Sequence, residues 1–301
     1  MRKLLMLVSL LFLVAAGAHA QTDVIDLWPE GVPNVRANPG PERVDGDRIS
    51  NVSRPTLTVY PAAIDRPART AVIVCPGGGY EFLSFTREAR QYAQWLSSLG
   101  ITAFVLKSRL GDYGHPAPLQ DVLRAIRTVR AQAQKYGVAP DRIGVMGSSA
   151  GGHLAASAAT LYDQPAGRTG AQLDAVSARP DFAILMYPVI TMDPSAAHMG
   201  SRQALLGVHP SAELVRLMSV EKQVTAQTPP TLLMHSQDDG AVPIENSILF
   251  FQALTRAHVP AEMYFFERGG HGMGMNPGLG NASNWPKRAE DWLRERHLIV
   301  Q

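Results

Sequence analysis

The chain has 301 residues, 46% of them hydrophobic, which is enough for one sizeable domain with a full hydrophobic core. Its 28 basic residues nearly balance 26 acidic ones and form no Lys/Arg-rich run, so the composition argues against a nucleic-acid partner. Cys75 is the only cysteine, which excludes an intramolecular disulfide. Because it ends an apolar run, we interpret it as a small buried side chain.

Residues 1–20 have the pattern of a secretory signal peptide. The basic residues Arg2 and Lys3 precede an apolar stretch too short to span a membrane comfortably, and Ala18-His19-Ala20 matches an A-x-A cleavage site. We therefore expect a mature chain from about Gln21 that is periplasmic or secreted, with no stable membrane insertion after cleavage. Without Arg2 and Lys3, 26 basic residues face 26 acidic ones.

Residues 21–301 form a single predicted domain in which strands alternate with helices. Residues 21–55 are rich in Pro, Gly, Asn and Asp, which indicates an irregular lead-in. The predicted elements that follow are strands 57–60 and 71–75, helix 87–99, strand 101–106, helix 119–136, strand 142–146, a helix from about 149, strands 182–189 and 231–235, helix 243–257, strand 261–266 and helix 285–297.

Several of these strands are apolar on both faces, as expected for a mostly parallel central sheet with helices on both sides. The weakest periodicity lies in residues 191–227, which contain short helical pieces around Ala204 and Leu214. Such sheets usually carry an inserted cap over the active site at this point in the chain, so we expect a small cap insertion here. The predicted fold class is α/β.

The most informative motif is Gly147-Ser148-Ser149-Ala150-Gly151, which matches G-x-S-x-G. It directly follows a strand-like run and precedes a helix-like one, and this is the context in which the motif forms a sharp turn that exposes the central hydroxyl. The flanking glycines are needed because a Cβ there would collide with the neighbouring chain. Ser149 is therefore the candidate nucleophile.

A glycine-rich loop, residues 76–79, follows the strand that ends at Cys75. Its exposed backbone N–H groups can stabilise an oxyanion, and we expect Gly78, with Gly79 as the second choice, to act with the N–H of Ala150. No Lys-Ser/Thr pair follows, which excludes a phosphate-binding P-loop, but a simple turn remains an alternative.

A serine hydroxyl needs a base, and the base needs an orienting acid. Asp239 is the predicted acid, in a loop after one strand, with Asp238 and Asp193 as alternatives. His271 is the predicted base, because it lies between glycines directly after the last strand. The order Ser149, Asp239, His271 is that of α/β-hydrolases. No metal or organic cofactor is expected.

Several sequence runs resemble bacterial α/β-hydrolases of the acetylxylan esterase and feruloyl esterase-like (BD-FAE-type) group. They include residues 74–80, 141–154, 187–190 and 270–272, and the match covers most of the chain from about residue 25. The resemblance implies a serine esterase with an α/β-hydrolase fold that removes acetyl groups from plant-polysaccharide oligosaccharides.

The expected partner is thus a small-molecule or oligosaccharide ester, and the oligomeric state stays open. Alternatives are a feruloyl or other small-acyl esterase, a peptidase of the same fold and a non-catalytic sugar-binding relative. The side chains considered for contact with a sugar are Tyr80, Arg109, His198 and Arg202.

Overall fold

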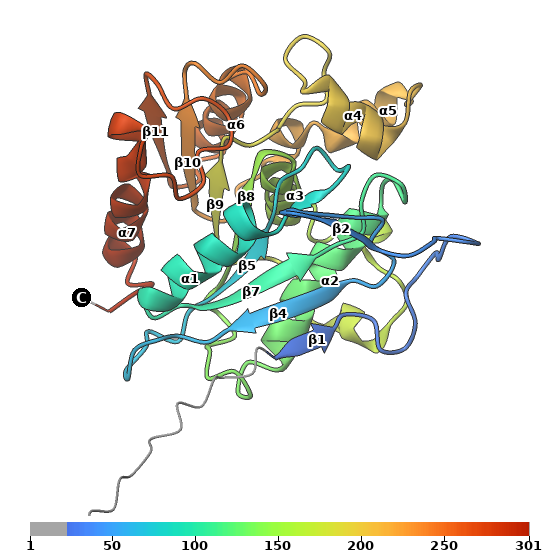
Figure 1. The fold of residues 1–301 in the computed structure, drawn as a ribbon, viewed down its shortest axis with the longest axis horizontal. Helices are drawn as coiled ribbons and strands as arrows, with labels where there is room; N and C mark the ends of the chain where they lie inside the picture. Colours follow the sequence, from blue (N-terminus) through green and yellow to red (C-terminus); the bar gives the residue numbers. More distant parts are fainter. Residues whose placement is uncertain (1–22, 301) are drawn as a thin grey trace, which may run out of the picture.

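The computed structural model describes residues 23–300, and Figure 1 shows its ribbon. The signal peptide predicted for residues 1–20 lies outside the described residues. Within the described part of the chain, none of the helices combines the length and the apolar character that crossing a bilayer requires.

An eight-stranded sheet forms the centre of the molecule, in the order β1-β4-β7-β5-β8-β9-β10-β11. Strand β4 runs antiparallel to β1 and β7, and all other neighbours are parallel, as predicted. The strands are β1 (Val24–Asp26), β4 (Thr56–Tyr60), β5 (Ala71–Cys75), β7 (Thr102–Lys107), β8 (Ile143–Ser148), β9 (Phe182–Met186), β10 (Thr231–Ser236) and β11 (Ala261–Phe266).

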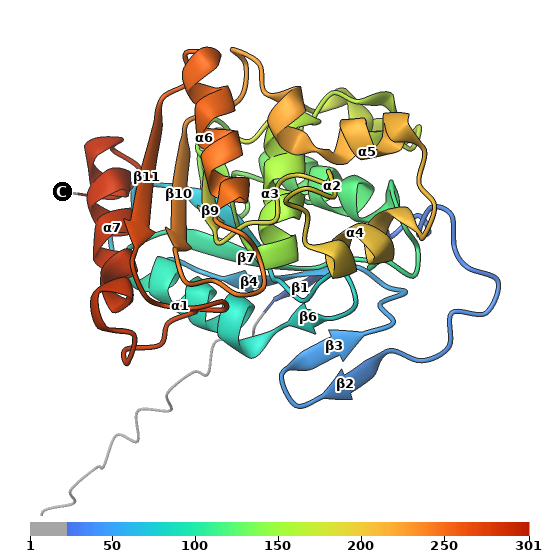
Figure 2. The same ribbon diagram turned by 90° about the horizontal axis from the view of Figure 1, so that it is seen from above.

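Helices cover both faces of this sheet (Figure 2). Strand β5 explains why: Ile73 and Cys75 belong to the apolar core beneath α2, α3 and α6, whereas Val72 and Val74 belong to the core beneath α1 and α7. This is the predicted α/β-hydrolase fold. The helices are α1 (Gln91–Ser98), α2 (Ala117–Ala131), α3 (Ser149–Thr160), α6 (Glu245–Arg256) and α7 (Trp285–Glu295).

The predicted insertion at residues 191–227 holds two short helices, α4 (Met199–Leu206) and α5 (Ala212–Met218), and a 3₁₀ turn, Val220–Gln223. His153, on α3, fastens this insertion to the body of the domain. Its Nε2 lies 2.8 Å from the carbonyl oxygen of Met218, and its Nδ1 lies 2.8 Å from the hydroxyl of Tyr80. A carbonyl only accepts, so Nε2 carries the proton and Nδ1 accepts from Tyr80.

This buried imidazole makes the stability of the fold depend on pH. Burial lowers the pKa of His153 to about 4, below the value near 6.5 of an unfolded chain. Between these values the unfolded chain binds a proton that the folded chain does not, so stability falls as the pH falls. We expect His153 to contribute a loss of about 3 kcal/mol in the free energy of unfolding between pH 7 and pH 4.

Urea denaturation of the native chain and of His153→Gln at several pH values measures this contribution. The variant should lose less stability on acidification, whereas His209→Gln, at an exposed position of the cap, should behave like the native chain. Equal slopes for the native chain and His153→Gln would assign the pH dependence to other groups.

The structure differs from the sequence prediction in the lead-in and at element ends. Residues 21–55 are not wholly irregular, because they hold β1 and a hairpin of β2 (Arg43–Asp45) and β3 (Arg48–Ser50), which pairs with β6 (Leu83–Ser84). Strand β9 ends at Met186 and not at residue 189, because Tyr187 has a positive φ of 36° and a proline follows.

Helices α1, α2, α6 and α7 are also shorter than predicted. Helix α2 ends at Ala131, five residues before the predicted end, because residues 132–137 form turns that close at Gly137 with a φ of +65°. Before α1, residues Thr86–Arg90 form a π-helical turn.

Candidate active site

Ser149 lies at the sharp turn between β8 and α3, with a φ of +53°. The two motif glycines make this turn possible. A Cβ on Gly147 would lie 2.1 Å from the carbonyl oxygen of Gly151, and a Cβ on Gly151 would lie 2.1 Å from the carbonyl oxygen of Cys75. The strained backbone of Ser149 is thus held by close packing on both sides of the motif.

The structure brings Ser149, His271 and Asp239 together at the carboxyl edge of the sheet, after β8, β11 and β10 respectively. His271 Nε2 lies 3.0 Å from Ser149 Oγ, and His271 Nδ1 lies 2.8 Å from Asp239 Oδ2. A neutral imidazole that donates its Nδ1 proton to the carboxylate presents the Nε2 lone pair to the hydroxyl. This is the geometry of a nucleophile, a general base and an orienting acid.

Asp239 has a fully buried carboxylate that is bound from several sides. Oδ1 accepts from the N–H groups of Ala241 and Val242, both at 2.9 Å, and Oδ2 lies 3.2 Å from His235 Nε2. Burial by itself raises the pKa of Asp239, but the hydrogen bonds from His235 and His271 outweigh burial and hold this pKa well below its usual range. The carboxylate therefore stays ionised near neutral pH.

The two alternative acids have other partners. Asp238 Oδ1 accepts from the N–H groups of Gly269 and Gly270, at 2.9 and 2.8 Å, and so fixes the loop before His271. Asp193 accepts from the hydroxyl of Ser195 at 2.8 Å and lies in the cap.

Tyr187 and Glu88 contact the site residues, although the sequence did not single them out. The ring of Tyr187 packs edge-on against His271, with 5.1 Å between centroids, and its hydroxyl donates to Glu88 Oε1 at 2.8 Å. Glu88 Oε2 accepts the N–H of Gly77 at 3.0 Å. Burial raises the pKa of Glu88, while the hydrogen bonds from Tyr187 and Gly77 act in the opposite direction.

Both supporting residues carry a weak sequence signal. Tyr187 directly follows an apolar strand at the same sheet edge as Ser149, and Glu88 is a lone acid next to the buried Ala89. Tyr187 and Glu88 thus connect the imidazole of His271 to the glycine-rich loop at Gly77.

Three backbone N–H groups are available near Ser149. Those of Gly78, Gly79 and Ala150 donate to no acceptor within residues 23–300. Ala150 lies in the first turn of α3, where the helix dipole favours negative charge. Gly78 has a φ of +131°, and a Cβ on it would lie 2.0 Å from the carbonyl oxygen of Phe82, so this position requires glycine.

A cavity of about 560 Å³ opens at Ser149 and His271, lined also by Gly78, Gly79 and His198. Its volume lies in the range of pockets that hold small molecules. His198, predicted to contact a sugar, lies at this cavity, and its Nδ1 accepts the N–H of Ser201 at 3.1 Å at the start of α4.

The other predicted sugar contacts have different surroundings. The prediction for Arg109 is wrong, because its side chain is fully buried and lies 2.8 Å from Asp121 Oδ1 in an ion pair. Arg202 Nε donates to the carbonyl oxygen of Met192 at 3.0 Å, and Arg202 is not among the described residues that line the cavity at Ser149. Tyr80 is 5% exposed and lines a neighbouring cavity.

Within residues 23–300, no group of three or more His, Cys, Asp and Glu side chains is arranged to hold a metal ion. Cys75 is buried, as expected from its apolar strand.

The chain is similar to known esterases and xylan-related proteins. It is 38% identical to the Endo-1,4-beta-xylanase B of Butyrivibrio fibrisolvens, over 69% of this chain and 33% of that protein. It is 32% identical to the acetylxylan esterase of Xylanibacter ruminicola, over 76% of this chain and 48% of that protein. The chain therefore spans a third to a half of the length of these curated relatives.

A solved structure aligns over nearly the whole chain. The acetyl ester-xyloside bifunctional hydrolase of Caldicellulosiruptor lactoaceticus has a TM-score of 0.84 and 38% identity, over 95% of this chain and 100% of that one. The carboxylesterase Cest-2923 of Lactobacillus plantarum has a TM-score of 0.70 and 27% identity, over 87% and 98%. The BD-FAE family model matches residues 57–254, and the chain therefore belongs to the BD-FAE family.

Proposed function

We propose that this protein is a serine carboxylester hydrolase that removes acetyl groups from xylan-derived oligosaccharides. The observation that carries the proposal is the hydrogen-bonded series Ser149–His271–Asp239 at a cavity that also exposes the N–H-rich loop at Gly78. The signal-peptide pattern of residues 1–20 adds export to a periplasmic or extracellular site of action.

The chemistry follows from this geometry. Ser149 Oγ attacks the ester carbonyl carbon while His271 Nε2 takes the hydroxyl proton, and Asp239 stabilises the resulting imidazolium. The N–H groups of Ala150 and Gly78, or of Gly79 in place of Gly78, donate to the oxyanion. The C–O bond to the sugar then breaks, and His271 returns the proton to the leaving alcohol. Water, activated in the same way, releases acetate and restores Ser149.

The identity of the acyl group and of the sugar rests on similarity to proteins named for acetylated xylan substrates. The cavity of about 560 Å³ has room for an acyl group together with part of a sugar, which fits an acylated glycoside. A charge balance of 26 basic and 26 acidic residues after the signal segment suits a neutral carbohydrate better than a polyanion.

Release of acetate and ferulate from a panel of acylated polysaccharides tests this proposal. We expect acetate from acetylated xylan oligosaccharides, with less product from acetylated mannan, acetylated pectin and feruloylated arabinoxylan. Ferulate as the main product would favour the feruloyl esterase, and cleavage of a prolyl amide without cleavage of acetyl esters would favour the peptidase. Absence of reaction with a fluorophosphonate probe would favour the sugar-binding relative.

A further inference from the structure

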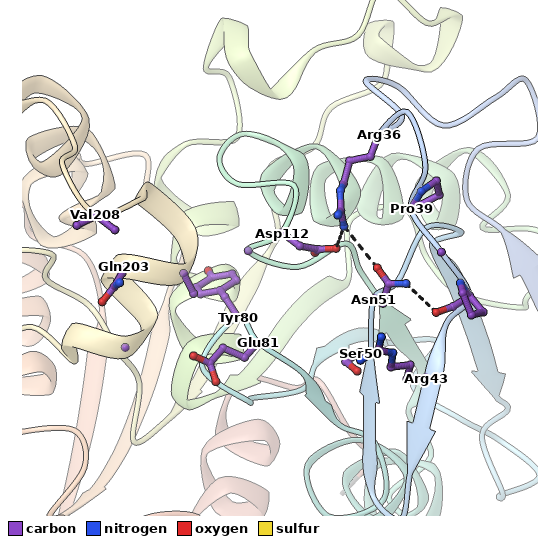
Figure 3. Close-up of a pocket in the computed structure, with 15 residues that line it drawn as sticks. Arg36, Pro39, Arg43, Ser50, Asn51, Tyr80, Glu81, Asp112, Gln203 and Val208 are labelled. Atoms are coloured by element: carbon purple, nitrogen blue, oxygen red, sulfur yellow. Dashed lines mark hydrogen bonds and ion pairs between the residues drawn. The ribbon is translucent and has the colours of Figure 1, made fainter.

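A second cavity of about 780 Å³ lies beside the one at Ser149, and Figure 3 shows its lining. We call it the arm cavity. Its walls come from residues 36–51 of the N-terminal segment, from the loops after β5 and β7 and from the cap around α4. Glu81 and Gly200 line both cavities. The two cavities therefore adjoin each other at Glu81 and Gly200, on the side of the arm cavity that is nearest to Ser149.

The N-terminal wall of the arm cavity is fixed by polar contacts. Arg36 Nη1 lies 2.5 Å from Asp112 Oδ2 and 3.4 Å from Asn51 Oδ1. Asn51 Nδ2 donates to the carbonyl oxygen of Pro41 at 2.7 Å, and these contacts are drawn in Figure 3. The contacts tie the N-terminal segment to the loop after β7, so the wall is formed before any ligand binds.

The lining suits a neutral, hydroxyl-rich ligand. Its charged residues are two arginines, Arg36 and Arg43, and two acids, Glu81 and Asp112, so their charges cancel. The side chains of Arg43, Glu81 and Gln203 all line the cavity. None of the three forms a hydrogen bond or ion pair with another side chain or backbone group of residues 23–300. A guanidinium that donates, a carboxylate that accepts and an amide that does both match sugar hydroxyls, which also do both.

We propose that the arm cavity binds the sugar units next to the acylated one, so that the preferred substrate is an oligosaccharide and not an acylated monosaccharide. This inference rests on the proposed function, since it takes the ester at Ser149 as the fixed end of the substrate. An aliphatic acyl chain is a poor occupant, because its entry would strip water from the polar side chains without replacing their hydrogen bonds.

The first test compares a long substrate, which would reach the arm cavity, with a short one, which would not. The ratio of kcat/KM for acetylated xylotetraose to kcat/KM for p-nitrophenyl acetate should fall at least about tenfold in Gln203→Trp, because the indole occupies the arm cavity. Gln203 is exposed on α4, and Gln252→Trp at an exposed site on α6 is the matched control, with an unchanged ratio. Arg43→Ala should lower the ratio roughly three- to tenfold, and Arg256→Ala is its control. This smaller substitution keeps the test valid if the Trp variant does not fold.

The second test measures binding without turnover. Calorimetry should detect xylotetraose binding to Ser149→Ala, and Gln203→Trp in that background should raise the Kd at least about tenfold. A loss in either the ratio or the binding supports the arm-cavity assignment, whereas variants that change neither overturn it. If xylotetraose binds and Gln203→Trp weakens that binding, but no acetate is released from acetylated xylan, the proposed function fails while the arm cavity remains a sugar-binding site.

Discussion

Ser149→Ala is expected to hydrolyse p-nitrophenyl acetate at least about 10³-fold more slowly than the native chain, because no other group can form the acyl-enzyme. The fold should persist, since alanine keeps the Cβ that serine already places at a φ of +53°. Initial rates together with a thermal melt separate loss of chemistry from loss of structure. A fluorophosphonate should label the native chain at Ser149 and leave the variant unlabelled.

Ser148→Ala is the matched control, because it removes the neighbouring hydroxyl of the same motif. Ser148 Oγ donates to the hydroxyl of Tyr92 at 3.1 Å, beneath the turn and away from the cavity. Loss of this one hydrogen bond should cost about 1 kcal/mol of stability and leave the rate within about tenfold. Full activity in Ser149→Ala, or inactivity confined to Ser148→Ala, would contradict the nucleophile assignment.

The central strands could be predicted because burial on both faces makes the whole strand apolar. Residues 71–75 and 261–266 are strands in the structure as in the prediction. The hairpin of β2 and β3 could not be predicted, because three-residue strands are too short to reveal an alternating pattern. The sequence predicts an end of α2 that is too late, because the residues between Ala131 and Gly137 form turns that lack any distinct sequence signal before the glycine.

The grouping of Ser149, His271 and Asp239 could be predicted because each lies in a loop directly after a parallel strand, and such loops meet at one edge of the sheet. Contacts between side chains that lie far apart in the sequence could not be predicted. The burial of Arg109 depends on Asp121 on α2, and the support of His271 depends on the contact between Tyr187 and Glu88. A local pattern does not tell whether a charged side chain faces solvent or a buried partner.

Asp239→Asn is expected to lower kcat for p-nitrophenyl acetate by about 10⁴-fold, the effect of the same change in a well-studied serine protease. An amide at this position can keep its oxygen toward the N–H groups of Ala241 and Val242 only by turning its NH₂ toward His271 Nδ1. His271 would then carry its proton on Nε2, facing Ser149, and could not act as a base. Initial rates, with circular dichroism to verify the fold, measure the loss.

Asp238→Asn provides the control, because it makes the same change in the neighbouring carboxylate. Asp238 accepts from Gly269 and Gly270 through one oxygen, Oδ1, and the side-chain oxygen of asparagine can accept the same two N–H groups. We expect Asp238→Asn to stay within about tenfold of the native rate, because asparagine keeps both hydrogen bonds and the loop before His271 keeps its position. A severe loss in Asp238→Asn together with near-native activity in Asp239→Asn would reverse the assignment. The orienting acid is the carboxylate whose negative charge stabilises the imidazolium, so its loss must slow the reaction most.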